Sequence, residues 1–355
     1  MPLGQTWLGR TSRHGALTLF LTVAAGGFTL YRVDAQSAVP PAAPKNVRLT
    51  AGSALFYSPW RPFYFPSSPW NTPIAPDATV DPNSAAMVQT IITDATSASF
   101  IIIVKQWTWT LYYADATTPR YTVALTSGYG GSKTKLVGVP IPNGAVPDPA
   151  GDGHMIILDT STGCEYDFWK AIHNSNATWS TAWANAISYV TGNGWYPHGY
   201  SATGGGAAGG AGLIRPEEMQ AGHIDHAIAF SYTYAKSGGP VWPATEADGS
   251  YAVGVPEGGR VQLDPALDLS TLGLKPYEVT IARALQEFGM ILMDNGGGVT
   301  LEAQNPISST IAYPWGDQTY VDLPRSLLSH LRVLTTGPQY QPNLFLENTA
   351  CANFQ

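Results

Sequence analysis

The sequence predicts a mainly β protein, a single domain of β-sandwich or jelly-roll type with one long helix near its C-terminus. Of its 355 residues 12% are charged, whereas Gly and Pro number 37 and 28, as in a chain rich in turns. Its 11 Trp and 18 Tyr favour strands, and several segments alternate apolar and polar residues with period two. The chain is long enough to bury a large core.

The first 50 residues are expected to precede this domain. Arg10 and Arg13 come before an uncharged run of 16 residues, 15–30. That run is shorter than the roughly 18 residues of a membrane span and is typical of a signal-peptide core. We therefore expect residues 1–35 to be a signal peptide and the protein to be secreted, or held at a membrane if this segment stays uncleaved. We also expect residues 36–50 to be a Pro/Ala linker and residues 51–355 to form the single domain.

Strands are expected in order along the domain. The segment 100–104 runs into 107–113, where Trp107, Trp109 and Leu111 alternate with polar or smaller residues. A turn at 159–163 joins two apolar runs and predicts a hairpin. The same reasoning predicts strands at residues 121–125, 154–158, 164–169, 224–234, 260–263, 299–302 and 331–334.

Helix signals occur at two places. Pro276 opens a run with Ile281, Leu285, Phe288 and Leu292 on one face, and Gly296 follows its expected end. A shorter helix is expected from Arg215-Pro216-Glu217-Glu218. Residues 192–212 hold nine glycines and are expected to form a loop that folds over something or stays mobile.

The two cysteines, Cys164 and Cys351, are expected to form a disulfide, since an exported protein matures in an oxidising compartment. The alternative is a catalytic Cys164 beside a free Cys351.

A pair of carboxylates is the first candidate for chemistry. On a strand, Glu165, Asp167 and Trp169 share one face because side chains alternate. Two acids at this spacing can serve as the pair of a glycosidase, and Trp169 offers a platform for a sugar ring. The alternative is a solvated strand face without chemistry.

Histidines supply the other candidates. His154 stands at the mouth of the strand expected to pair with 164–169, where it can act as a base or hold a hydroxyl, or simply cap a turn. On a strand His223 and Asp225 face the same way, so Asp225 can orient His223, while His226 faces the core. The spacing lacks a third ligand, so we expect no metal and no cofactor.

The glycine-rich loop carries a further group, Tyr196, His198 and Tyr200. Loops on a rigid β scaffold often carry binding residues, so these are expected to contact substrate.

Two resemblances to known families follow from motifs. The order of Ser161, Gly163 and Cys164 resembles that of exported L,D-transpeptidases, but the histidine and arginine of their motif are missing. Segments across 68–335 resemble a family of large exported bacterial proteins, often with Ig-like or carbohydrate-binding modules, that has no established activity. The segments are SPWNTPI (68–74), GDGH (151–154), GLIRPEE (212–218), GHIDHA (222–227), ALQEFGM (284–290) and DNG (294–296). This second resemblance implies export and a shared fold, and it transfers no catalytic residue.

Taken together, the sequence predicts a secreted carbohydrate-active enzyme acting on a polysaccharide or cell-wall glycan, a glycoside hydrolase or a lyase. A non-catalytic, lectin-like glycan-binding module is the main alternative, and a cysteine enzyme like the L,D-transpeptidases is the third. The net charge of −7 argues against a nucleic-acid partner, which requires a basic face.

Overall fold

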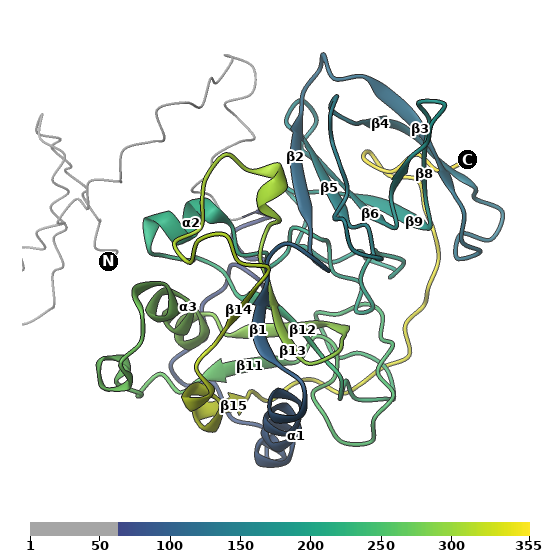
Figure 1. The fold of residues 1–355 in the computed structure, drawn as a ribbon. Coiled ribbons are helices and arrows are strands. Elements are labelled where there is room, and N and C mark those ends of the chain that lie inside the picture. Colours follow the sequence, from purple (N-terminus) through teal and green to yellow (C-terminus); the bar gives the residue numbers. More distant parts are fainter. Residues whose placement is uncertain (1–62) are drawn as a thin grey trace, which may run out of the picture. The chain divides into compact units, whose positions relative to one another are not determined.

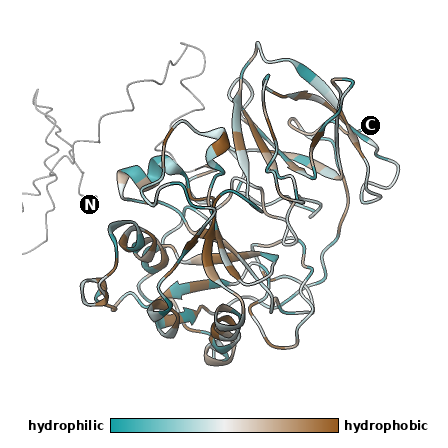
Figure 2. Ribbon diagram, viewed as in Figure 1, coloured by the Kyte–Doolittle hydropathy of each residue, from teal (hydrophilic) through white to brown (hydrophobic). Residues whose placement is uncertain are grey.

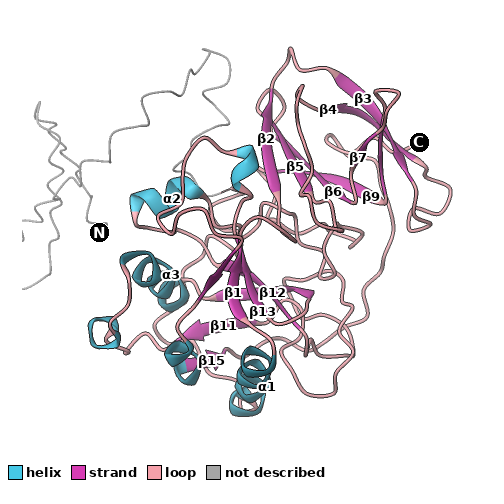
Figure 3. Cartoon of the chain, viewed as in Figure 1, coloured by secondary structure: helices cyan, strands magenta, loops and turns pink. Residues whose placement is uncertain are grey.

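The computed structural model describes residues 63–355. The expected signal peptide (1–35), the linker (36–50) and the first residues of the expected domain lie outside the described residues. The described part is mainly β, as predicted, with three sheets and few helices (Figure 1, Figure 3). None of the helices in residues 63–355 is long and apolar enough to cross a membrane.

The largest sheet has seven strands in the order β14-β1-β13-β10-β12-β11-β15. It is mixed, because β1 runs parallel to β13 and β10 parallel to β12, while β10 and β13 are antiparallel. The strands are β1 (Phe100–Ile103), β10 (Ile228–Tyr232), β11 (Arg260–Leu263), β12 (Met290–Asn295), β13 (Val299–Glu302), β14 (Tyr320–Asp322) and β15 (Leu331–Val333).

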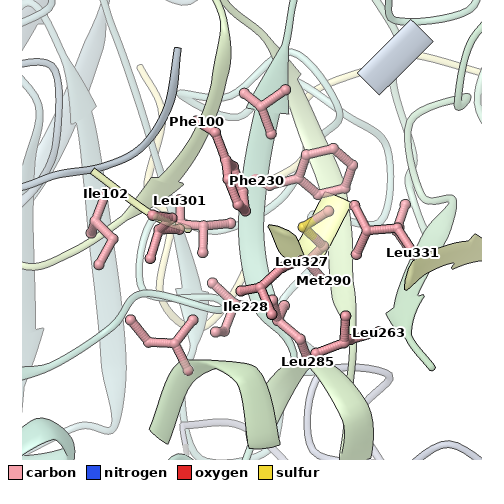
Figure 4. Close-up of a cluster of buried hydrophobic side chains, with 14 of the residues drawn as sticks. Phe100, Ile102, Ile228, Phe230, Leu263, Leu285, Met290, Leu301, Leu327 and Leu331 are labelled. Atoms are coloured by element: carbon pink, nitrogen blue, oxygen red, sulfur yellow. The ribbon is translucent and has the colours of Figure 1, made fainter. Parts of the chain in front are cut away.

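Helices cover one face of this sheet. Helix α1 contacts β15 and β13, and α3 contacts β11. Strand residues Ile102, Phe230 and Leu301 and helix residue Leu285 belong to one buried cluster between helices and sheet (Figure 4). In Figure 2 the strands at the centre of this sheet are largely brown, the colour of hydrophobic residues. The helical segments are α1 (Ser84–Ser97), α2 (Pro216–Ala221), α3 (Pro276–Glu287), η1 (Leu269–Leu272), η2 (Pro306–Ser308) and η3 (Arg325–His330).

Two four-stranded sheets complete the fold, in the orders β2-β5-β6-β9 and β4-β3-β8-β7. Val123 of one sheet and Phe168 of the other lie in the same buried cluster, so the two sheets share a core. A third cluster contains Leu111 and Ile156 of the sheet β2-β5-β6-β9 together with Ile291 of the seven-stranded sheet. The strands are β2 (Thr110–Ala114), β3 (Arg120–Leu125), β4 (Lys135–Pro140), β5 (Met155–Asp159), β6 (Cys164–Trp169), β7 (Ile172–His173), β8 (Trp179–Thr181) and β9 (Trp183–Ser188).

The helix expected from Pro276 is present but shorter than predicted. Helix α3 begins at Pro276 and has 12 residues. Helix α1, in a segment where the sequence predicts no helix, has 14 residues, so α3 is not the one long helix of the fold. Gly289 takes φ +73 and its N–H bonds to the Ala284 carbonyl, which ends the helix. Leu292 therefore lies in strand β12 rather than on the helix.

Strand pairing also differs in part from the prediction. The hairpin β5–β6 is present, with Met155 opposite Phe168. In contrast, β2–β5 and β3–β8 are parallel pairs, which an antiparallel jelly roll does not contain.

The disulfide is present as predicted, joining Cys164 and Cys351 across 187 residues. The C-terminal segment then pairs with the edge of β4, where Leu136 bridges to Phe354. Phe354 is buried and stacks on Trp183. The chain end is thus held both covalently and by packing.

Candidate functional site

The face of the seven-stranded sheet that lies away from the helices carries polar side chains. In β13, Val299 and Leu301 point into the helix-side core, so Thr300 and Glu302 point the other way. Ser231 of β10 is paired with Thr300, and their hydroxyls lie 2.6 Å apart. A row of polar groups therefore runs across the centre of the sheet.

A β-bulge brings Asp294 to this same face. In the pairing of β10 with β12 the register shifts between Phe230 and Ser231, so that Ser231 is opposite Asp294. Without the extra residue, Asp294 would share the face of Leu292, which belongs to the apolar core under the helices. Bulges commonly re-aim a side chain next to a functional site, and this one places a carboxyl group beside Ser231 and Thr300.

The parallel pairing of β2 with β5 positions two rings opposite that face. Thr110 is in register with Met155, so the preceding residues Trp109 and His154 are neighbours. Their rings stack with centroids 4.1 Å apart and planes 7° apart. The Trp109 Nε1–H donates to Glu302 Oε2 at 2.7 Å. Trp109 thus links His154 to the carboxyl group of Glu302 in the seven-stranded sheet.

Two adjoining hollows open at these residues, and together they form what we call the cleft. The Trp107 hollow, about 410 Å3, includes Trp107, Glu302 and Tyr320. The Trp169 hollow, about 310 Å3, includes Trp169 and Tyr129. Each volume is within the range of small-molecule sites. Both hollows are lined by the same four residues, which we call the shared group: Asp152, His154, Asp294 and Asn295.

Burial and mutual repulsion hold protons on carboxyl groups of the cleft. Partial burial, with the nearby charge of Asp248, raises the pKa of Asp294 to about 7. Glu302 is 6% exposed, and its burial and the charge of Asp294 raise its pKa to about 8. Near neutral pH these groups are therefore protonated to a large extent, so they can donate a proton.

The imidazole ring of His154 is held in its neutral form. Removal from water lowers its pKa to about 4, with Asp152 opposing the shift. Its Nδ1 is buried without a hydrogen-bond partner within the described chain. A neutral imidazole donates a hydrogen bond from one ring nitrogen and accepts one at the other. Since His154 lines both hollows, its ring can hold a hydroxyl group of a ligand.

Two of the five non-glycine residues with positive φ in the described part of the chain stand in the walls of the cleft. Trp107 and Tyr200, which line the two hollows, both have positive φ values, 63° and 53°. Bulky residues adopt this conformation at a cost of about 1–3 kcal/mol each, and such residues cluster at functional sites. The Trp107 N–H is held by Asp148 Oδ1 at 3.1 Å, which fixes the loop that carries the indole.

The expected acid pair, Glu165 and Asp167, is placed differently. Both side chains are 0% exposed, and neither lines the two hollows. Glu165 accepts from the Tyr64 hydroxyl and the Gly210 N–H, each at 2.7 Å. Burial raises the pKa of both carboxyls, and in Glu165 the charge of Asp167 adds to this effect.

Asp167 has a matching set of donors. It accepts from the Tyr196 hydroxyl at 2.8 Å and from the Gly209 N–H at 3.0 Å. The pair therefore ties the glycine-rich loop to β6, and this loop packs against the core rather than standing free. The sequence predicts an accessible acid pair, Glu165 and Asp167, in one depression with His154. This prediction is wrong, because both side chains are buried.

Of the expected binding residues, Trp169 and Tyr200 do lie in the cleft. The Trp169 Nε1–H donates to Asp152 Oδ1 at 3.1 Å. Tyr196 and His198 do not line it. They border a separate groove beside the C-terminal segment, where His198 stacks on Phe345.

His223 and Asp225 pair with each other at 2.5 Å but are 54% and 53% exposed, and neither lines the cleft. They follow α2 and do not belong to a strand, contrary to expectation. His226 is buried, as expected, with its Nε2 3.1 Å from Glu218 Oε1.

Cys164 is bonded to Cys351, so it has no thiolate to act as a nucleophile. The disulfide therefore contradicts the alternative of a catalytic Cys164 in an enzyme like the L,D-transpeptidases.

The site residues expected from the sequence do not include Asp152, Asp294 and Glu302. The alternation Val299-Thr300-Leu301-Glu302 is a signal that can identify the polar strand face. Asp294 gives no such signal, because the helix expected from the sequence runs through residues 290–295.

Within residues 63–355 there is no group of three or more His, Cys, Asp or Glu side chains that could hold a metal ion. Comparison with protein-family models, curated proteins and solved structures gave no significant match. The resemblance to exported bacterial proteins thus stays a prediction.

Proposed function

We propose that this protein is a secreted glycoside hydrolase that cuts a polysaccharide in the cleft. The observation that carries the proposal is the placement of Asp294, a carboxyl group with its pKa raised to about 7, in a cavity walled by aromatic rings. Glycosidases pair a protonated acid with a second carboxylate, and raised pKa values mark the acid.

In this proposal Asp294 is the general acid and Asp152 is the second carboxylate. Asp294 gives its proton to the glycosidic oxygen as the C–O bond breaks. A water molecule supplies the hydroxyl group to the anomeric carbon and its remaining proton goes to Asp152. Both residues belong to the shared group, so both border the Trp107 hollow and the Trp169 hollow.

The other residues support this step. Glu302, hydrogen-bonded to Trp109, keeps an acidic proton beside Asp294 and so limits the negative charge at the site. His154 holds a sugar hydroxyl, and Trp169 stacks a ring. The two four-stranded sheets, which share one core, act in this proposal as a β-sandwich that supports the Trp169 side of the cleft.

The test is release of reducing ends from a panel of neutral and amino polysaccharides by the wild type and Asp294→Asn. We expect the wild type to act on at least one member and Asp294→Asn to lose nearly all turnover while it still binds. Asp77→Asn, at an exposed residue that lines neither hollow, is the matched control and is expected to keep full activity. Retention of a glycan without any turnover would instead indicate the lectin-like module.

A further inference from the structure

The cleft extends from the shared group into two hollows. Asp152, His154, Asp294 and Asn295 border both hollows, and each hollow has further walls of its own. A reaction centred on these residues therefore has room for substrate on either side of the bond that is cut. A pocket that accepts a chain end would have room on one side.

Each hollow also has its own aromatic surface. Trp107 is 46% exposed and Tyr320 is 40% exposed in the Trp107 hollow. Tyr129, 55% exposed, and Trp169 stand in the Trp169 hollow. Exposed aromatic side chains next to a cavity supply flat apolar surface for the faces of sugar rings.

The charge of the lining selects among glycans. Five carboxyl groups border the cleft: Asp152, Glu246, Asp248, Asp294 and Glu302. No Lys or Arg is among the described residues that line either hollow. Lys170 lies 4.4 Å over the Trp169 ring, but it is not part of the lining. An acidic sugar chain would bring negative charge into a partly desolvated space that is lined by carboxyl groups and offers it no cationic partner.

We infer that the cleft takes an internal stretch of a linear glycan without acidic groups, with sugar units in both hollows and the bond to be cut at the shared group. This inference rests on the proposed function for the cutting step. It adds an endo mode of action and the exclusion of uronate polymers. The binding part stands on the walls and charge of the cleft.

Binding is tested by calorimetry with neutral and amino oligosaccharides of increasing length and with polygalacturonate. Affinity for at least one neutral or amino series should rise with length until both hollows are filled, and then level off. Trp107→Ala and Trp169→Ala should each weaken binding of the long oligomer about tenfold, the scale of one aromatic contact. Trp242→Ala, at a Trp that is 69% exposed and lines neither hollow, should bind like the wild type.

Cleavage is tested on the same oligomers by product analysis. The inference predicts internal fragments as first products, and a shift of the cleavage position in Trp107→Ala. Release of single sugars from an end, tighter binding of polygalacturonate, wild-type binding by both Trp variants, or binding of no neutral or amino oligomer would overturn it. Length-dependent binding without cleavage would uphold the occupant inferred here and refute the proposed hydrolase instead.

Discussion

Replacing Glu302 by Gln tests the electrostatics of the cleft through protein stability. Burial raises the pKa of Glu302 to about 8 from an ordinary value of 4.5. Between these two values the folded chain keeps a proton that the unfolded chain has lost. The stability contributed by this group is therefore fully present below pH 4.5 and is lost as pH rises to about 8.

The magnitude follows from the linkage relation. One such group lowers the free energy of unfolding by about 1.4 kcal/mol for each pH unit in this window, which is on the order of 4 kcal/mol from pH 5 to pH 8 as an upper bound. Gln is neutral at every pH and its carbonyl oxygen can still accept from Trp109 Nε1. We expect Glu302→Gln to match the wild type at pH 5 and to be more stable at pH 8.

The assay is urea unfolding of both proteins at pH 5, 6, 7 and 8. Glu287→Gln, at an exposed position of α3, is the control for the same chemical change and should follow the wild type. If the difference between Glu302→Gln and the wild type does not grow with pH, the protonated carboxyl in the cleft is refuted.

The remaining predictions concern the scaffold. Glu165→Ala removes the acceptor of the Tyr64 hydroxyl and the Gly210 N–H, so it should lower the free energy of unfolding by about 2–5 kcal/mol in urea titrations, and Glu165→Gln by clearly less. Gly210→Ala would place its Cβ 2.8 Å from Glu165 Oε1 and should reduce the melting temperature. Gly337→Ala, whose Cβ would have no heavy atom within 4 Å, is the control and should keep the wild-type melting temperature. Equal melting temperatures of the two variants would contradict this packing. Cys351→Ser removes the disulfide that closes a loop of 187 residues and should lower the free energy of unfolding by about 2–5 kcal/mol. Urea unfolding of both proteins with and without reductant measures this loss. A variant as stable as the oxidised wild type would show that the disulfide does not stabilise the fold.

Strand alternation was sufficient to predict much of the sheet structure. The limits of β11 and β13 agree with the sequence, and the shared face of Glu165 and Asp167 was inferred from alternation alone. Alternation does not say what covers a face. Here Gly209 and Gly210 close over the two carboxyls, and that contact joins residues more than 40 positions apart.

The candidate site depended on two features that periodicity does not reveal. Gly289 ends α3 and starts a strand within a run whose apolar spacing is helical. The bulge in β12, between Leu292 and Asp294, then turns Asp294 toward the cleft. Local sequence sets neither the register between β10 and β12 nor the meeting of Trp109 with Glu302, since both depend on pairing across the fold.

The most direct test of the central claim is the pH dependence of kcat/KM on a glycan that the wild type cuts. With Asp294 as the general acid, activity requires its proton, so kcat/KM should fall as pH rises through about 7. Asp294→Asn should lose turnover at every pH and keep its affinity for the substrate. An activity that stays constant from pH 6 to pH 9, or an Asp294→Asn enzyme as active as the wild type, would contradict the account.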